Sequence, residues 1–197
     1  MWPEYASDKV IDALDKLIGT VAKFTREVAE KSITGNDIAV AERHVSANLI
    51  EVLELADQAR LEGRRGTANS AAAIECASTL IRIAYRFELI AHIRLARSEA
   101  LRDQGADKHQ ADFKAAFYTG LEVQRIKLRR SDSSERAVRP SVALEELSPV
   151  KDYLAALEST RLSSETLVLL ARELAFYRRL PDLLLSLDRS LSWLDVS

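Results

Sequence analysis

The chain has 197 residues, a formal net charge of −2, 6 glycines and 4 prolines. A chain of this length can bury a sizeable core, and its near-neutral charge excludes binding to nucleic acid or anionic membranes through net charge alone. Turn residues are scarce and no run alternates apolar with polar residues, which excludes a protein built of many strands. The abundance of Ala, Leu, Glu and Arg instead predicts an all-α protein.

The cellular setting follows from one cysteine and the hydropathy pattern. Cys76 has no second cysteine to pair with, and its apolar helical surroundings predict a buried, unreactive thiol. The first residues lack the apolar core of a secretory signal. The most apolar stretch, residues 71–95, is interrupted by four charged residues, which disfavours a membrane span. We therefore expect a cytoplasmic location and no membrane partner.

Two helices are predicted first, over residues 7–31 and 38–61. The first has apolar residues alternately four and three apart, as in a coiled coil, and Gly19 is a weak point or a place of close approach. The short turn between the helices predicts an antiparallel hairpin, with Asn36 or Asp37 as the second N-cap. The apolar stripe of the first helix is Val10, Leu14, Leu17, Val21, Phe24 and Val28, and that of the second is Ile38, Ala41, Val45, Leu49, Val52, Ala56 and Ala59.

A third helix is predicted over residues 67–103, capped by Thr67 or Asn69. One apolar stripe has small residues every seven positions with large ones beside them, and a second apolar face predicts a central helix. Glu88 occupies a position in the first stripe where a large apolar residue is expected. The small residues are Ser70, Ala77, Ala84, Ala91 and Ser98, the large ones Ile74, Ile81 and Leu95, the second face Leu80, Ile83, Phe87 and Ile90, and the polar stripe Glu75, Thr79, Arg82 and Arg86.

A fourth helix over residues 107–130, with Phe113, Phe117, Leu121 and Leu128 inward, completes a predicted antiparallel four-helix bundle over residues 1–130. Residues 131–141 are polar and non-periodic, which predicts a flexible linker. Residues 142–197 are expected to form a smaller helical part packed on the bundle, with helices at 148–158, from Ser163 or Ser164 to Arg179, and from Pro181 onward.

Glu88 and His92 are one helical turn apart in the apolar stripe, where an unpaired charge is costly. The favoured interpretation is a polar pair that fixes helix register, or a stripe that is less buried than its pattern indicates. The alternative is a metal or proton-transfer site completed by His44 or His109. We expect no metal and no cofactor, because the Glu-x-x-His motif of di-metal bundles is missing.

Arg86 and His92 have a spacing similar to that of HEPN-class ribonucleases, which are also all-α. This resemblance implies an RNA-cleaving enzyme with Arg86, Glu88 and His92 at its site. On one continuous helix, however, Arg86 and His92 point about 120° apart, so they converge on one phosphate only if the helix breaks between them.

A basic cluster ends the fourth helix, with Arg125, Lys127, Arg129 and Arg130, followed by Arg136 and Arg139. Cations at a helix C-terminus are favourable in themselves. The functional alternative is an anion or nucleic-acid contact by Arg125, Arg129 and Arg130, without aromatic residues for base stacking.

The last helix carries a leucine-rich face, with Leu185 and Trp193 off it. It either folds back onto the bundle or binds a partner. Because catalytic motifs are missing and apolar helix surface is abundant, the sequence predicts a non-enzymatic interaction module, adaptor or scaffold that self-associates. The residues expected to make contact are Leu183, Leu184, Leu187, Leu191, Trp193 and Leu194.

Overall fold

The computed structural model describes residues 6–30, 33–96, 106–129 and 164–194. These residues form helices joined by turns, without a strand, and the all-α prediction is confirmed for them. None of the described helices is long and apolar enough to cross a membrane. The helices are α1 (Ala6–Glu30), α2 (Gly35–Ala59), α3 (Arg64–Ala96), α4 (Ala106–Arg129), α7 (Ser164–Tyr177) and α8 (Leu180–Leu191).

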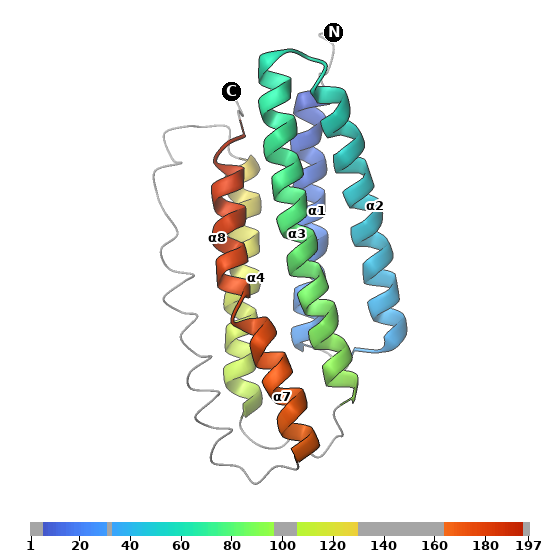
Figure 1. The fold of residues 1–197 in the computed structure, drawn as a ribbon, viewed down its shortest axis with the longest axis vertical. Helices are drawn as coiled ribbons and strands as arrows, with labels where there is room; N and C mark the ends of the chain where they lie inside the picture. Colours follow the sequence, from blue (N-terminus) through green and yellow to red (C-terminus); the bar gives the residue numbers. More distant parts are fainter. Residues whose placement is uncertain (1–5, 31–32, 97–105, 130–163, 195–197) are drawn as a thin grey trace.

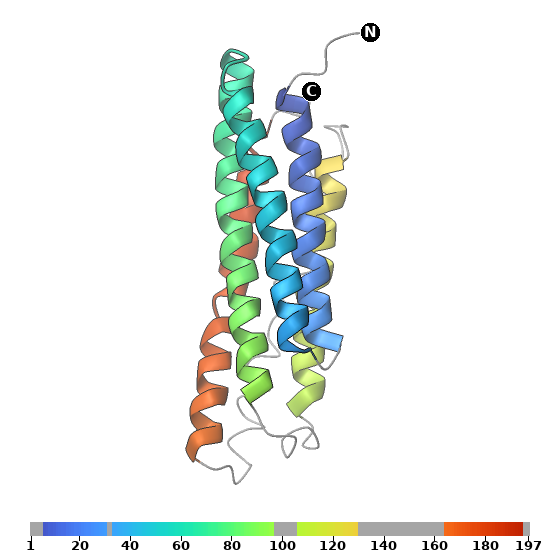
Figure 2. The same ribbon diagram turned by 90° about the vertical axis from the view of Figure 1, so that its right-hand side faces the viewer.

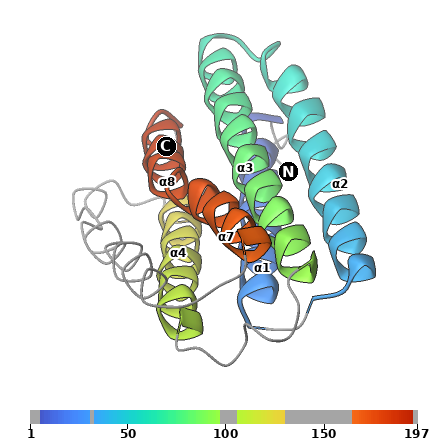
Figure 3. The ribbon, with the colours of Figure 1, turned by 60° about the horizontal axis from the view of Figure 1, so that its bottom comes forward.

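The helices α1 and α3 lie in the middle of the structure. Figure 1 shows α2 on one side of them and α4 with α8 on the other. Helix α1 packs on α2, α3 and α4, whereas α3 packs on α1, α2, α7 and α8. Figure 2 shows the long helices lying side by side along the molecule, and Figure 3 shows α7 beside α3. The predicted central position of the third helix therefore agrees with these contacts.

The core forms where the apolar stripes of the long helices meet. Every residue of the stripe predicted for the first helix is buried in α1, and Ile18 beside it is fully buried too. The second apolar face of α3 is its deepest face, and the Phe87 ring lies 5.4 Å from that of Phe117 on α4. Burying each such side chain contributes about 1.5–3 kcal/mol. Burial of the apolar stripes that this periodicity creates is thus the main source of stability of this fold.

Part of the pattern predicted for α3 is wrong. The large residues of the first stripe lie at its edge, because Ile74 and Leu95 are exposed. Thr79, which was assigned to the polar stripe, is fully buried. The reason is that α3 is covered by four helices, so its buried sector is wider and rotated relative to the stripe of small residues.

The helix ends also differ from the predictions. Thr34, rather than Asn36 or Asp37, caps α2: its hydroxyl accepts a hydrogen bond from the Asp37 amide, while the Asp37 carboxylate accepts one from the Thr34 amide. Helix α3 begins at Arg64, so neither Thr67 nor Asn69 caps it. The preceding turn uses Gly63 at φ +89°, a conformation that favours glycine.

The C-terminal helix α8 folds back onto α3 and α4. The Lys127 ammonium on α4 lies 2.7 Å from the Asp188 carboxylate on α8. The division into a four-helix bundle and a smaller C-terminal part stays a prediction. The linker expected at 131–141 and the helix expected at 148–158 lie outside the described residues.

Candidate functional site

Three side chains that could hold a metal ion meet on the outer side of α2 and α3. Glu88 and His92 are one turn apart on α3, as the sequence indicates, and Glu42 reaches them from α2. One ligand atom from each of the three lies within 4.8 Å of the other two. Glu42 and His92 are exposed, and Glu88 is partly buried. We call this group the Glu42–Glu88–His92 cluster.

The electrostatics of the cluster centre on Glu88. Partial burial raises its pKa, and so do the charge of Glu42 and a hydrogen bond with the Glu42 carboxyl group, whereas His92 lowers it. The polar pair expected from the sequence is therefore a group of three.

Sequence reasoning missed Glu42 because it belongs to a different helix. Only the pairing of α2 with α3 brings it beside Glu88. The ligands that the sequence suggested instead do not join the cluster in the described structure. His44 lines a separate pocket between α1 and α2, together with Lys23 and Glu27, and the side chain of His109 lies outside the described residues.

The structure does not bring Arg86 and His92 together. Helix α3 is continuous from Arg64 to Ala96, and six residues of α-helix place the two side chains about 120° apart. The geometry on which the RNA-cleavage alternative depends, a helix broken between the two residues, is not found in α3.

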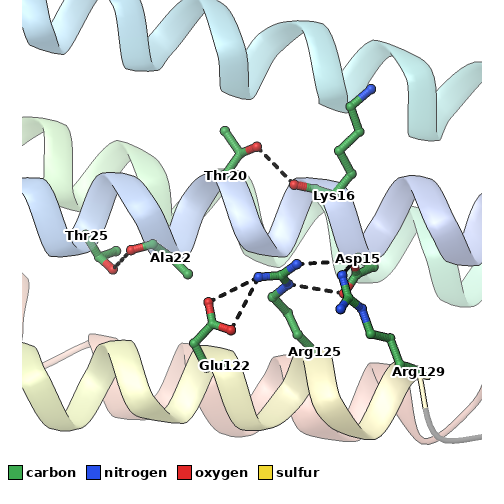
Figure 4. A network of polar contacts seen from close by, with 8 residues as sticks. All are labelled: Asp15, Lys16, Thr20, Ala22, Thr25, Glu122, Arg125 and Arg129. Carbon is green, nitrogen blue, oxygen red and sulfur yellow. Dashed lines mark hydrogen bonds and ion pairs between the residues drawn. The ribbon is translucent and has the colours of Figure 1, made fainter.

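The basic residues at the end of α4 contact an acidic residue of α1. The Arg125 guanidinium donates two hydrogen bonds to the Asp15 carboxylate, from Nε at 3.1 Å and from Nη2 at 3.3 Å. Arg129 donates a third at 2.6 Å, and Glu122 accepts from Arg125 at 3.3 Å (Figure 4). Arg125 and Arg129 therefore join α4 to α1 through an internal ion pair, and their contact with an external anion or nucleic acid stays a prediction. Arg130 lies outside the described residues.

Asp15 is the centre of this second network. Burial alone raises its pKa, but hydrogen bonds from Arg129 and Arg125 and their positive charges outweigh burial, so the pKa is lowered. The same hydrogen bonds raise the pKa of Arg125. Gly19 makes room for the guanidinium, since a Cβ atom there would lie 2.9 Å from its central carbon. Of the two roles predicted for Gly19, close approach is the one observed.

The expected contact face of the last helix is mostly internal. Of the six residues predicted to make contact, Trp193 is the one that is exposed. Leu185, which lies beside the predicted face, is exposed as well. The other five, Leu183, Leu184, Leu187, Leu191 and Leu194, are buried in the core cluster. These five leucines already pack against the chain's own helices, and a partner contact through them stays a prediction.

Several of the exposed large apolar side chains belong to α2 and α3. Ile50 and Leu53 on α2, and Ile74 and Tyr85 on α3, are between 42 % and 57 % exposed. We call these four residues the α2–α3 face. Leu49 and Ile81 lie beside them, partly buried against the core. A single exposed leucine is ordinary in a folded protein, but a group of large apolar residues on one surface is typical of an interaction site.

Comparisons of the chain with protein-family models, with curated proteins and with solved structures gave no match.

Proposed function

We propose that this chain is a non-enzymatic interaction module that self-associates through the α2–α3 face. The observation that supports the proposal is the exposure of Ile50, Leu53, Ile74 and Tyr85 on one pair of helices. Removing such side chains from water is the main driving force of protein association. A scaffolding role in the cytoplasm is part of the proposal, supported by a lone buried cysteine that fits a reducing compartment.

The pairing of α2 with α3 supports a continuous face. The two helices are packed together and joined by a short turn, and Glu42 on α2 lies beside Glu88 on α3. Leu49 lies seven residues after Glu42 on α2, and Ile81 lies seven residues before Glu88 on α3. In an antiparallel pair these two residues lie at the same level. Leu53 and Ile74 lie further along the same direction, so the apolar residues follow one line.

The spacing on α3 favours a helical partner. Its solvent side carries Ile74, Ser78, Ile81 and Tyr85, which are alternately four and three residues apart. This is the spacing by which one helix packs lengthwise on another. A second copy provides the same stripe, and a twofold axis can pack the two stripes on each other.

The outer side of α2 and α3 limits the area that a second copy can cover. The 25 residues of α2 extend about 38 Å, and two packed helices are about 20 Å wide. The whole outer side of the two helices, charged residues included, therefore offers at most about 750 Å² per copy, and the four apolar residues take up part of it; a stable interface buries ~800 Å² of each partner.

The test is the mass of the purified chain, measured by native mass spectrometry and by sedimentation. We expect a dimer for the wild type and a monomer for the Leu53→Glu/Tyr85→Glu double variant, because each charge would be buried in the interface. The matched control is Val168→Glu, an equally exposed apolar position on α7, which should stay dimeric.

A wild type that is monomeric at high concentration would refute the proposal. So would a Leu53→Glu/Tyr85→Glu chain that keeps its dimer with an unchanged helical signal. If Trp193→Ser removed the dimer instead, the interface would lie on α8, and the α2–α3 face would be excluded.

A further inference from the structure

Two carboxylates and an imidazole from two different helices converge in the Glu42–Glu88–His92 cluster. The backbone fixes the origin of each side chain, because the spacing of Glu88 and His92 puts both on one side of α3 and α2 packs beside them. We infer that this cluster is a binding site for one divalent transition-metal ion, with zinc as the best-fitting metal.

The donor set favours zinc over the alkaline-earth ions. Ca²⁺ and Mg²⁺ prefer oxygen ligands alone, whereas one imidazole nitrogen with two carboxylate oxygens is a set that zinc accepts. Three protein ligands leave a further coordination position for water, as in zinc sites that are not purely structural. The site therefore suits an exchangeable zinc ion at the protein surface.

The distances allow the site to close. Zinc–oxygen and zinc–nitrogen bonds of about 2.0–2.2 Å place tetrahedral ligands about 3.4 Å apart. The three donor atoms here lie within 4.8 Å of one another without an ion. The side chains of Glu42 and His92 are exposed, so rotations about their own bonds can close the remaining distance while the helices stay in place.

Electrostatics favours a cation at this point. Glu42 and Glu88 repel each other when both are charged, and a divalent ion between them removes this repulsion. Among the described residues, the Glu42–Glu88–His92 cluster is the group of three potential metal ligands whose donor atoms lie close together. Bound metal would join α2 to α3 near the end of the pair that is far from their connecting turn, and it would stabilise the folded chain.

The test is a calorimetric titration of the purified chain with zinc chloride. We expect one zinc ion per chain, and affinity reduced at least about tenfold by His92→Ala and by Glu42→Gln. The matched control is His44→Ala, which removes an exposed histidine of α2 outside the cluster and should leave the affinity unchanged. All three positions are exposed, so the variants should keep the wild-type helical signal.

A second measurement separates a bound ion from a purely structural role. Zinc should raise the melting temperature of the wild type and of His44→Ala, but not that of His92→Ala. Zinc binding that fails to saturate, or that His44→Ala weakens as much as His92→Ala does, would overturn the assignment. All three ligands come from one copy. Repeating the titration on the Leu53→Glu/Tyr85→Glu variant separates zinc binding from self-association, because zinc should bind that variant as it binds the wild type.

Discussion

The ion-pair network around Asp15 gives the sharpest stability prediction. Replacing Asp15 with Asn keeps the size of the side chain and removes its charge. The Asn amide keeps one acceptor oxygen and has an NH₂ group in place of the other, so at least one of the three hydrogen bonds from Arg125 and Arg129 is lost and none keeps a charged acceptor. We expect the variant to fold with a lower free energy of unfolding.

The magnitude follows from burial. The Asp15 side chain is only 14 % exposed, and hydrogen bonds of this charged kind contribute about 1.5–3 kcal/mol. Arg129 is 63 % exposed, so solvent screening limits its share to less than about 0.5 kcal/mol. Glu122 still accepts from Arg125 in the variant, which reduces the loss. We therefore expect Asp15→Asn to cost about 2 kcal/mol at neutral pH.

The pH dependence gives an independent check. The folded pKa of Asp15 lies below its ordinary value of 3.8, so its contribution is complete above that value and is lost as the pH falls through the folded pKa. Urea unfolding followed by the helical circular dichroism signal should show the full difference at neutral pH. As the pH falls below 3.8, the difference between the wild type and Asp15→Asn should shrink steadily.

The control is another ion pair of α1. Lys16 and Glu51 lie 2.6 Å apart, but both side chains are largely exposed. Glu51→Gln should therefore cost less than about 0.5 kcal/mol. If Asp15→Asn costs no more than Glu51→Gln, or if its cost persists undiminished in acid, the reasoning from burial is wrong.

Three further predictions concern the core and the turns. Burial, aided by the negative charge of Glu75, raises the pKa of the Cys76 thiol to about 12. Iodoacetamide at about pH 8 should therefore modify urea-unfolded but not native protein, and equal modification rates in the two states would contradict this. A Cβ at Gly66 would lie 2.0 Å from the Ala59 carbonyl oxygen, so Gly66→Ala should cost more than about 2 kcal/mol in urea unfolding. Gly35→Ala meets nothing within 4 Å and should change stability by less than about 0.5 kcal/mol; similar losses in both variants would contradict the contact. Thr34→Ala should cost about 1 kcal/mol by removing the capping box of α2, and an unchanged unfolding midpoint would argue against that cap.

The sequence alone determined which segments are helical and much of what they bury. Helical periodicity is local, because residues three and four apart share a face whatever packs against it. That is why the α1 stripe from Val10 to Val28 is buried as predicted. For the same reason the sequence indicated that Glu88 is a charged residue in an apolar stripe and that it lies one helical turn from His92.

Contacts between helices were decided by the tertiary structure. Periodicity shows how apolar a face is, but it does not identify the helix that covers it. Glu42 meets Glu88 only through the pairing of α2 with α3, and Asp15 meets Arg125 only because α4 packs on α1. Thr79 is buried, and the leucines of α8 other than Leu185 are internal, because other helices cover them. Residues distant in the sequence come together through packing, which depends on the shape and burial of whole helices rather than on any local pattern.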